Sequence, residues 1–302
     1  MKSEVKRAII LAIAVVLVVI GIKIFQSRDT TLKDLAKRGY DENEINILLN
    51  KLNEEEIKNT IHSEYNECLP KVLNHKYFIK DNLYNYLKYC KENKDLDWVI
   101  GGVNTGVINI GTDKKWYEGA KEVTNLTNSM LVNKFNFLSL DYKPDDIKDV
   151  INWYAYGNQS IKEEVYNQFI KMYNTALNEN LRIIINSSYR TYDEQKNIHN
   201  NSSDDYAARA GFSEHQTGLA LDFTTTKGVI FEETDEFKWL QTNAYKYGFI
   251  LRYPKGKEHI TGFSYEPWHY RYLGVELATS VYESGLTYEE YYAYYCDYKG
   301  QC

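Results

Sequence analysis

The segment SEHQTGLALDF, residues 213–223, decides the expected fold of this chain and its expected site. Its second half alternates Leu and Ala with Asp222 and Phe, which is the composition of a largely buried β-strand. An aspartate in such a strand is costly unless it is paired or bound to a metal ion. His215 lies in the loop before the strand, and Gly218 lets that loop turn back. We therefore expect a strand over 219–224 that brings a histidine and an aspartate together.

A second segment, EPWHYRYLG at residues 266–274, supplies another imidazole and a carboxylate. Pro267 disfavours a helical Glu266, so we expect a strand that begins at His269. Positions three apart on a regular strand face opposite sides, and a turn or bulge at the proline is needed to aim both side chains at one metal ion. Taken alone, the pair would equally fit a surface glutamate and a packed histidine. Together the two segments offer two histidines and one aspartate, the three-ligand pattern of a catalytic zinc site.

The chain before these segments predicts a helix and then a strand. Residues 161–178 have the apolar spacing of an amphipathic helix, and LRIIINS over 181–187 reads as a buried strand. Arg190 follows directly, and Thr191 or Asp193 can begin the next helix. Arg190 alone would be read as a surface cation or a structural ion pair.

The N-terminus predicts a membrane anchor. Residues 1–7 are basic, and residues 8–25 are almost wholly apolar, at the short end of the length that spans a bilayer. No small-residue cleavage site follows, so we expect a retained anchor rather than a cleaved signal peptide. The basic end should stay in the cytoplasm, which places the rest of the chain outside. The formal charge of −6 and the lack of a basic stripe argue against binding to nucleic acid.

Residues 31–66 read as short helices, with a capping box formed by Asp41 and Glu44 and a third helix capped by Asn53. They could be mistaken for a DNA-binding helix-turn-helix, but an anchored chain should not meet DNA. We expect a helical module or stalk, with a further helix over 78–93.

The stretch after the module is harder to read. Residues 98–110 are rich in β-formers and glycine and predict strand structure, whereas 121–137 read as helical. The four cysteines contain no CxxC pair, so a cysteine zinc site is not expected. Cys296 and Cys302 could form a disulfide in an extracellular domain, and four free thiols are the alternative.

The segments SSYR, SEHQTGLALDF and EPWHYRYLG together resemble the VanY-like D-alanyl-D-alanine carboxypeptidases of the zinc-dependent M15 peptidase family. The resemblance extends through YGFILRYPKGKEHITGFSYEPWHYRYLG and back to LVNKFNFLSLDY. What it implies for the site is a Zn²⁺ ion on His215, Asp222 and His269, Glu266 as general base, Arg190 as the donor to the oxyanion, and substrate contacts from Ser213 and Gln195.

The fold that the resemblance implies is α+β, with a small antiparallel sheet flanked by helices of the hedgehog and DD-peptidase type. A small helical module and an N-terminal transmembrane helix would precede it. The expected domains are a cytoplasmic tail at 1–7, an anchor at 8–25, a helical module or stalk at 28–95, a catalytic domain at 96–290 and a C-terminal tail at 291–302.

The function that the resemblance implies is removal of the C-terminal D-alanine from peptidoglycan stem peptides, outside the bacterial membrane. The sequence has no HExxH or GxSxG motif, which argues against helical zincins and serine peptidases of the α/β-hydrolase type. The same ligands would also serve an L,D-carboxypeptidase or a stem-peptide endopeptidase. A non-catalytic wall-binding protein with a structural zinc is a further alternative, and Glu266 counts against it.

Overall fold

The computed structural model describes residues 29–92, 95–110 and 115–302, which form an α+β protein. The chain divides into two compact units, Met1–Ile100 and Gly101–Cys302. The expected anchor at 8–25 lies outside the described residues. Within the described part of the chain, every helix is too short or too polar to cross a bilayer.

The first unit is helical, as the capping residues predict. Asp41 and Asn53 each form a complete capping box, at the starts of α2 (Glu42–Lys51) and α3 (Glu54–His62). The next two helices, α4 (Cys68–Leu73) and α5 (Leu83–Cys90), are joined by a disulfide between Cys68 and Cys90. The buried side chains of one apolar core in this unit are Leu35, Tyr40, Ile45, Leu48, Ile57, Leu69 and Leu73.

The second unit is built on a four-stranded antiparallel sheet in the order β5-β6-β8-β7. The strands are β5 (Ile183–Ser187), β6 (Ala220–Thr225), β8 (Glu266–Tyr272) and β7 (Phe249–Tyr253). The strands predicted around residues 181–187 and 219–224 are therefore confirmed, and the small antiparallel sheet is present.

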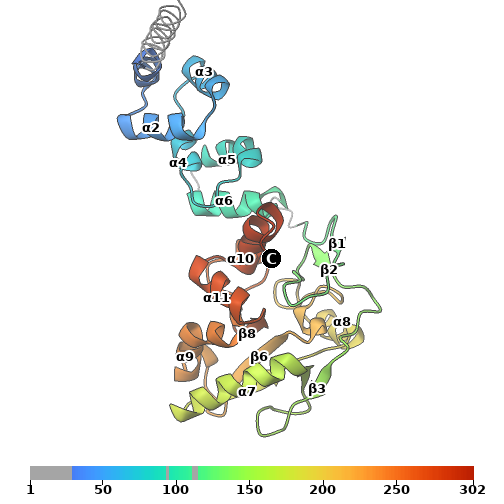
Figure 1. The fold of residues 1–302 in the computed structure, drawn as a ribbon. Coiled ribbons are helices and arrows are strands. Elements are labelled where there is room, and N and C mark those ends of the chain that lie inside the picture. The colour runs from blue at the N-terminus through green and yellow to red at the C-terminus, as the bar shows by residue number, and fades with distance from the viewer. Residues whose placement is uncertain (1–28, 93–94, 111–114) are drawn as a thin grey trace, which may run out of the picture. The chain divides into compact units, whose positions relative to one another are not determined.

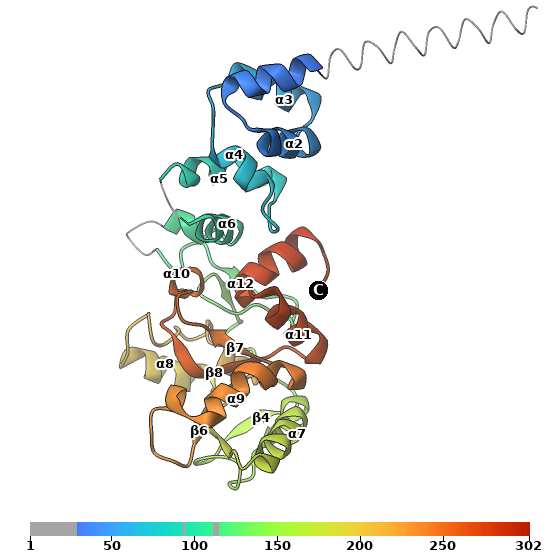
Figure 2. The same cartoon turned by 90° about the vertical axis from the view of Figure 1, so that its left-hand side faces the viewer.

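The two faces of this sheet differ in chemistry because successive side chains on a strand point to opposite sides. One face carries the apolar residues of the main core, among them Leu221 and Phe223 of β6 and Tyr270 of β8. Two helices pack against it, α7 (Glu163–Asn178) and α9 (Asp235–Asn243), and Figures 1 and 2 both place α7 beside β6. The residues that alternate with these on the same strands belong to the opposite face, which includes Asp222 and His269.

The remaining elements of the second unit surround the sheet. Two small sheets pair β1 (Lys121–Glu122) with β2 (Asn136–Phe137) and β3 (Ile147–Asp149) with β4 (Ser160–Lys162). Helix α8 (Tyr192–Asn200) follows β5, and α10 (Glu258–Thr261) precedes β8. The chain ends with α11 (Val275–Ser284), α12 (Tyr288–Tyr291) and a π-helical turn over Tyr292–Tyr298, next to a disulfide between Cys296 and Cys302.

Two segments have a different secondary structure from the one expected, and the strand expected to begin at His269 begins three residues earlier, at Glu266. Residues 98–110, for which strand structure is expected, instead form most of α6 (Leu96–Asn104) and a 3-10 turn at Val107–Ile110. A Cβ atom at Gly101 would lie 2.5 Å from Glu290 Oε1, so this helical glycine serves close packing rather than a turn. Residues 121–137, read as helix, form β1, β2 and an irregular loop. The loop has its own hydrogen bonds, such as Phe135 N to Asn133 Oδ1 at 3.0 Å, and such local bonds compete with a helix.

Candidate metal centre and active site

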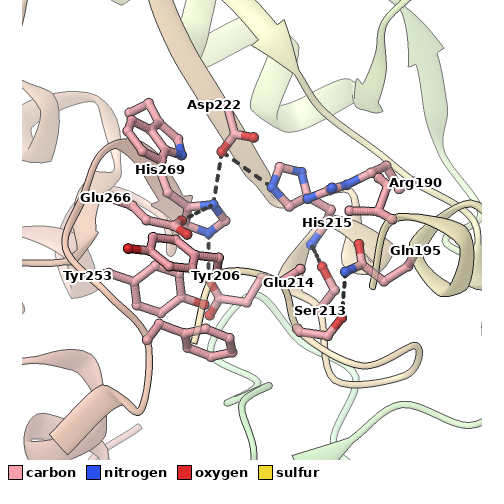
Figure 3. A pocket seen from close by; sticks show the side chains of 15 residues that line it. Arg190, Gln195, Tyr206, Ser213, Glu214, His215, Asp222, Tyr253, Glu266 and His269 are labelled. Atoms are coloured by element: carbon pink, nitrogen blue, oxygen red, sulfur yellow. Dashed lines mark hydrogen bonds and ion pairs between the residues drawn. The ribbon is translucent and has the colours of Figure 1, made fainter. Parts of the chain in front are cut away.

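The structure brings together the three residues that the sequence offers as metal ligands. One donor atom from each of His215, Asp222 and His269 lies within 4.8 Å of the other two, in a pocket on the polar face of the sheet. The three come from different elements: a turn before β6, β6 itself and β8. Figure 3 shows their polar atoms converging on one point.

His215 is placed by a short 3-10 turn, Glu214–Thr217. Ser213 caps the start of the turn, with its Oγ accepting from His215 N at 3.3 Å, and Gly218 ends it with a left-handed φ of +70°. His215 Nδ1 lies 2.6 Å from the carbonyl oxygen of Ser188. Because a carbonyl only accepts, Nδ1 carries the proton and Nε2 is left to face Asp222.

Asp222 and His269 are direct cross-strand neighbours on β6 and β8. Asp222 Oδ1 lies 3.0 Å from His269 Nδ1 and 3.4 Å from His215 Nε2. A tetrahedral zinc ion with bonds of about 2.0–2.2 Å keeps its ligand atoms about 3.4 Å apart. The donor set and its spacing therefore fit a zinc ion with three protein ligands and an open position.

Glu266 is the first residue of β8, and its side chain lines the same pocket as the three candidate ligands. The pairing of β8 with β7 shifts register here, because Leu251 faces Tyr270 while Tyr253 faces Glu266. This is the irregularity that the sequence requires, and it leaves Glu266 Oε2 3.8 Å from His269 Nδ1. Burial raises the pKa of Glu266 to about 7, although His269 and Arg190 act in the opposite direction. A carboxylate with such a pKa suits a general base at neutral pH.

The two histidines have different electrostatic surroundings. Burial and the nearby cation of Arg190 lower the pKa of His215 to about 4, so its ring is neutral. Burial would also lower the pKa of His269, but its hydrogen bonds to Asp222 and Glu214 raise it to about 9 in the protein without metal. A metal ion must therefore displace a proton from His269, which is usual for imidazole ligands.

The other predicted site residues line the same pocket. Arg190 is largely buried beside His215 (Figure 3), its Nε has no hydrogen-bond partner among the described residues, and burial lowers its pKa. Gln195 on α8 donates Nε2 to Ala208 O at 2.7 Å, while its buried Oε1 is unpaired there. Ser213 keeps its hydroxyl proton after capping the turn. Each of the three therefore has a polar group left for a ligand.

Among the pocket residues that the sequence does not single out, three adjoin His269. The ring of Tyr253 stacks on His269 with centroids 4.8 Å apart, and Trp268 is partly exposed at the pocket between Pro267 and His269. Glu214 is fully buried, and its Oε2 lies 3.4 Å from His269 Nε2. The sequence signal for Glu214 is its place beside His215. Tyr253 does not stand out in a chain with 28 tyrosines, and neither does Trp268.

The part of the chain that holds this site is similar to known proteins. The sequence model of the VanY family, described as D-alanyl-D-alanine carboxypeptidase, matches residues 158–275, which include every site residue above. YodJ of Bacillus subtilis, named as a carboxypeptidase, is 39% identical over 198 residues, covering 60% of this chain and 72% of YodJ.

Two solved structures are each similar to more than half of the chain. The LdcB LD-carboxypeptidase has a TM-score of 0.54 and 38% identity, covering 59% of this chain and 91% of LdcB. A glutamate-to-alanine variant of the vancomycin-resistance D,D-pentapeptidase VanY, in complex with Zn(II), has a TM-score of 0.50 and 32% identity. It matches 54% of this chain and 98% of that structure.

Proposed function

Since the chain belongs to the VanY family of D-alanyl-D-alanine carboxypeptidases, it is a zinc-dependent hydrolytic peptidase, and we propose that His215, Asp222 and His269 are its zinc ligands. Its reaction is the removal of the C-terminal D-alanine from peptidoglycan stem peptides. The observation that carries the assignment of the site is the convergence of these three donor atoms beside one buried carboxylate, Glu266.

Zinc, when bound, lowers the pKa of a coordinated water and polarises the scissile carbonyl. Glu266 is the group that moves the proton: it accepts one from the attacking water and delivers it to the leaving amine. In the protein without metal its pKa is raised to about 7 by burial, so this environment favours a carboxylate that readily accepts a proton. Its position 3.8 Å from His269 Nδ1 puts it within reach of a water in the open position.

Arg190 and the polar groups around it are proposed to hold the substrate. A guanidinium lining the pocket can donate to the carbonyl oxygen as negative charge develops there, which typically contributes on the order of 10²–10³ in rate. The hydroxyl of Ser213 is our candidate donor to the terminal carboxylate of the substrate. Gln195 Oε1 is a free acceptor that can receive a substrate N–H group.

We also propose that the catalytic unit works outside the cell membrane, held by the apolar segment at 8–25. The similar LdcB carboxypeptidase recognises peptidoglycan. All four cysteines are paired, Cys68 with Cys90 and Cys296 with Cys302, as suits an oxidising compartment. Fractionation of the cells that make the protein, followed by protease treatment of intact protoplasts, tests this placement; a protease-resistant catalytic unit would contradict it.

The decisive experiment is mass spectrometry of defined muropeptides after incubation with the purified protein and Zn²⁺. We expect a pentapeptide stem to lose one D-alanine and a tetrapeptide stem to stay intact. Loss of D-alanine from the tetrapeptide alone would mean an L,D-carboxypeptidase, and cleavage inside the stem an endopeptidase. Either result would overturn the proposed substrate while leaving the zinc site in place.

The role of Glu266 is tested with Glu266→Gln, which keeps the shape of the side chain but removes the base. We expect stoichiometric zinc with kcat reduced at least about 10²-fold, the lower range for loss of a general base. Glu276→Gln, a change at an exposed position on α11, is the matched control and should cleave at the wild-type rate. Near wild-type cleavage by Glu266→Gln would remove Glu266 from the mechanism.

A further inference from the structure

Four charged side chains are buried together behind the candidate metal centre. The side chains of Glu214, Arg252 and Arg271 have no exposed surface, and that of Glu289 on α12 is 4% exposed. Their charges sum to zero, with two carboxylates and two guanidinium groups. Buried charges are tolerated only when they are paired and hydrogen-bonded, so the four side chains have to be considered as one unit, which we name the buried charge cluster.

Glu214 connects this cluster to the metal centre, and its two oxygens have different partners. Oε1 accepts from Arg252 Nε at 2.8 Å and from Arg271 Nη1 at 2.8 Å. Oε2 faces His269 Nε2 at 3.4 Å. Because two guanidinium groups donate to one of its oxygens, Glu214 is present as a carboxylate, which can only accept hydrogen bonds.

The chemistry of that contact fixes which nitrogen of His269 carries a proton. A partner that only accepts requires a proton on Nε2, and a neutral ring then has its lone pair on Nδ1. Nδ1 is the nitrogen that lies 3.0 Å from Asp222 Oδ1 and faces the pocket. Glu214 thus selects the form of His269 that is able to bind a metal ion on the pocket side.

We propose that Glu214 is a positioning residue for the zinc site, which sets the tautomer and ring orientation of His269 and is itself fixed by Arg252 and Arg271. This inference rests on the proposed role of His269 as a zinc ligand. Carboxylate partners of metal-binding histidines typically raise metal affinity 10–100-fold. The ring of Tyr253, stacked on His269, supports the same orientation from one face.

Glu289 shows how the chain keeps Glu214 in place. It receives two hydrogen bonds from Arg252, Nη1 to Oε2 at 2.8 Å and Nη2 to Oε1 at 2.6 Å, and a third from Asn133 Nδ2 at 3.3 Å. The C-terminal helix α12 therefore secures an arginine that secures Glu214. Glu289 contacts Arg252 and Asn133 and is not hydrogen-bonded to a candidate metal ligand. Glu289→Gln is a matched control because it leaves Arg252 one acceptor oxygen, while Arg271 still holds Glu214 Oε1.

The test is the zinc affinity of Glu214→Gln, measured by competition with a chelator on protein shown to be folded by circular dichroism. The two arginines require an oxygen where Oε1 now lies, so the new amide would turn its NH₂ group toward His269 Nε2. That donor favours the proton on Nδ1, where zinc has to bind. We expect the zinc Kd to rise about 10–100-fold, with a changed visible spectrum of the Co²⁺-substituted protein.

Glu289→Gln changes one carboxylate of the same cluster and is expected to lower the melting temperature while leaving the zinc Kd within about threefold of wild type. The inference is overturned if Glu214→Gln binds zinc with wild-type affinity, or if Glu289→Gln weakens zinc binding equally. The latter result would mean a general loosening of the fold. His269→Ala tests the ligand assignment separately from the role of Glu214, because zinc retained in that variant would refute the assignment of His269 as a ligand.

A measurement on the wild-type protein keeps the inference testable if Glu214→Gln fails to fold. Long-range ¹H–¹⁵N NMR of the zinc-loaded protein reports which ring nitrogen carries a proton, and the spectrum of Glu266→Gln, with its intact ligands, provides a reference. We expect His269 with protonated Nε2 and metal on Nδ1. A deprotonated Nε2 would overturn the role of Glu214.

Discussion

Gly218 separates the turn that holds His215 from the strand that holds Asp222, and Gly218→Ala tests whether its backbone positions the site. Its φ is +70°, in the left-handed region, where a residue with a Cβ atom costs about 1–2 kcal/mol. A Cβ atom would also lie 2.8 Å from Ile147 Cδ1 and 3.0 Å from Lys162 Cγ. Both contacts are with side-chain atoms that can shift, so we take the lower end of the overpacking range, about 1 kcal/mol.

The expected loss is therefore about 2–3 kcal/mol in the free energy of unfolding of the second unit. For a unit of about 200 residues, this corresponds to a fall of about 4–12 °C in melting temperature. Tryptophan fluorescence follows mainly this unit, which holds four of the five tryptophans. Gly228→Ala is the matched control, because Gly228 has a φ of +65° and a Cβ atom there would meet no heavy atom within 4 Å.

Gly228→Ala should lose only the conformational part, about 1–2 kcal/mol. It should also keep the zinc affinity of the wild type, whereas Gly218→Ala should bind zinc more weakly because its turn has to move. Equal stability losses in the two variants, to within about 0.5 kcal/mol, would refute the argument from the contacts with Ile147 and Lys162. Unchanged zinc binding by Gly218→Ala would show that this turn does not position His215.

Two further predictions concern protons and disulfides. The pKa of His269 is raised to about 9 in the protein without metal. Below that pH a proton competes with zinc for His269, so the zinc affinity rises as the pH rises. We expect the zinc Kd to fall about tenfold per pH unit between about pH 6 and 8. Calorimetry in buffers of different ionisation enthalpy should detect about one proton released at about pH 7, and a pH-independent Kd would contradict the raised pKa. The Cys68–Cys90 disulfide closes a separation of 22 residues, for which the chain-entropy relation gives about 3 kcal/mol. Urea unfolding of a Cys68→Ala, Cys90→Ala protein should show that loss in the helical unit, and an unchanged midpoint would contradict it.

The local features of the fold could be predicted from the sequence because they depend on neighbouring residues. Asp41 and Asn53 are capping residues whose partners lie three positions on, and both capping boxes are present. The strand around Asp222 follows from alternation alone. Residues 98–110 are rich in β-branched residues, but packing favours a helix there. Residues 121–137 contain helix-forming residues, but side-chain hydrogen bonds to the backbone favour an irregular loop.

The candidate metal ligands could be proposed from the sequence because their residue types and spacing are unusual together. Their supporting residues could not, since the contacts join distant parts of the chain. Glu214 meets Arg252 across 38 positions and Arg271 across 57, and no local pattern states such a pairing. The disulfide of the first unit could not be predicted for the same reason, because Cys68 and Cys90 are 22 positions apart, in helices that meet only in the folded unit.

A signal for the buried charge cluster was nevertheless present in the strands themselves. Arg252 lies in the apolar run FILRY and Arg271 in HYRYLG, and a cation in a strand that reads as buried needs a carboxylate partner. Alternation along β8 places Arg271 on the same face as His269, and register pairs it with Ala220, two residues before Asp222. Arg271 therefore lies on the same face as Asp222 and His269, and Glu214, next to His215, is the carboxylate that both arginines contact. One segment, residues 213–223, thus supplies the core through Leu221 and Phe223, two of the proposed metal ligands, and the carboxylate that we propose orients the third.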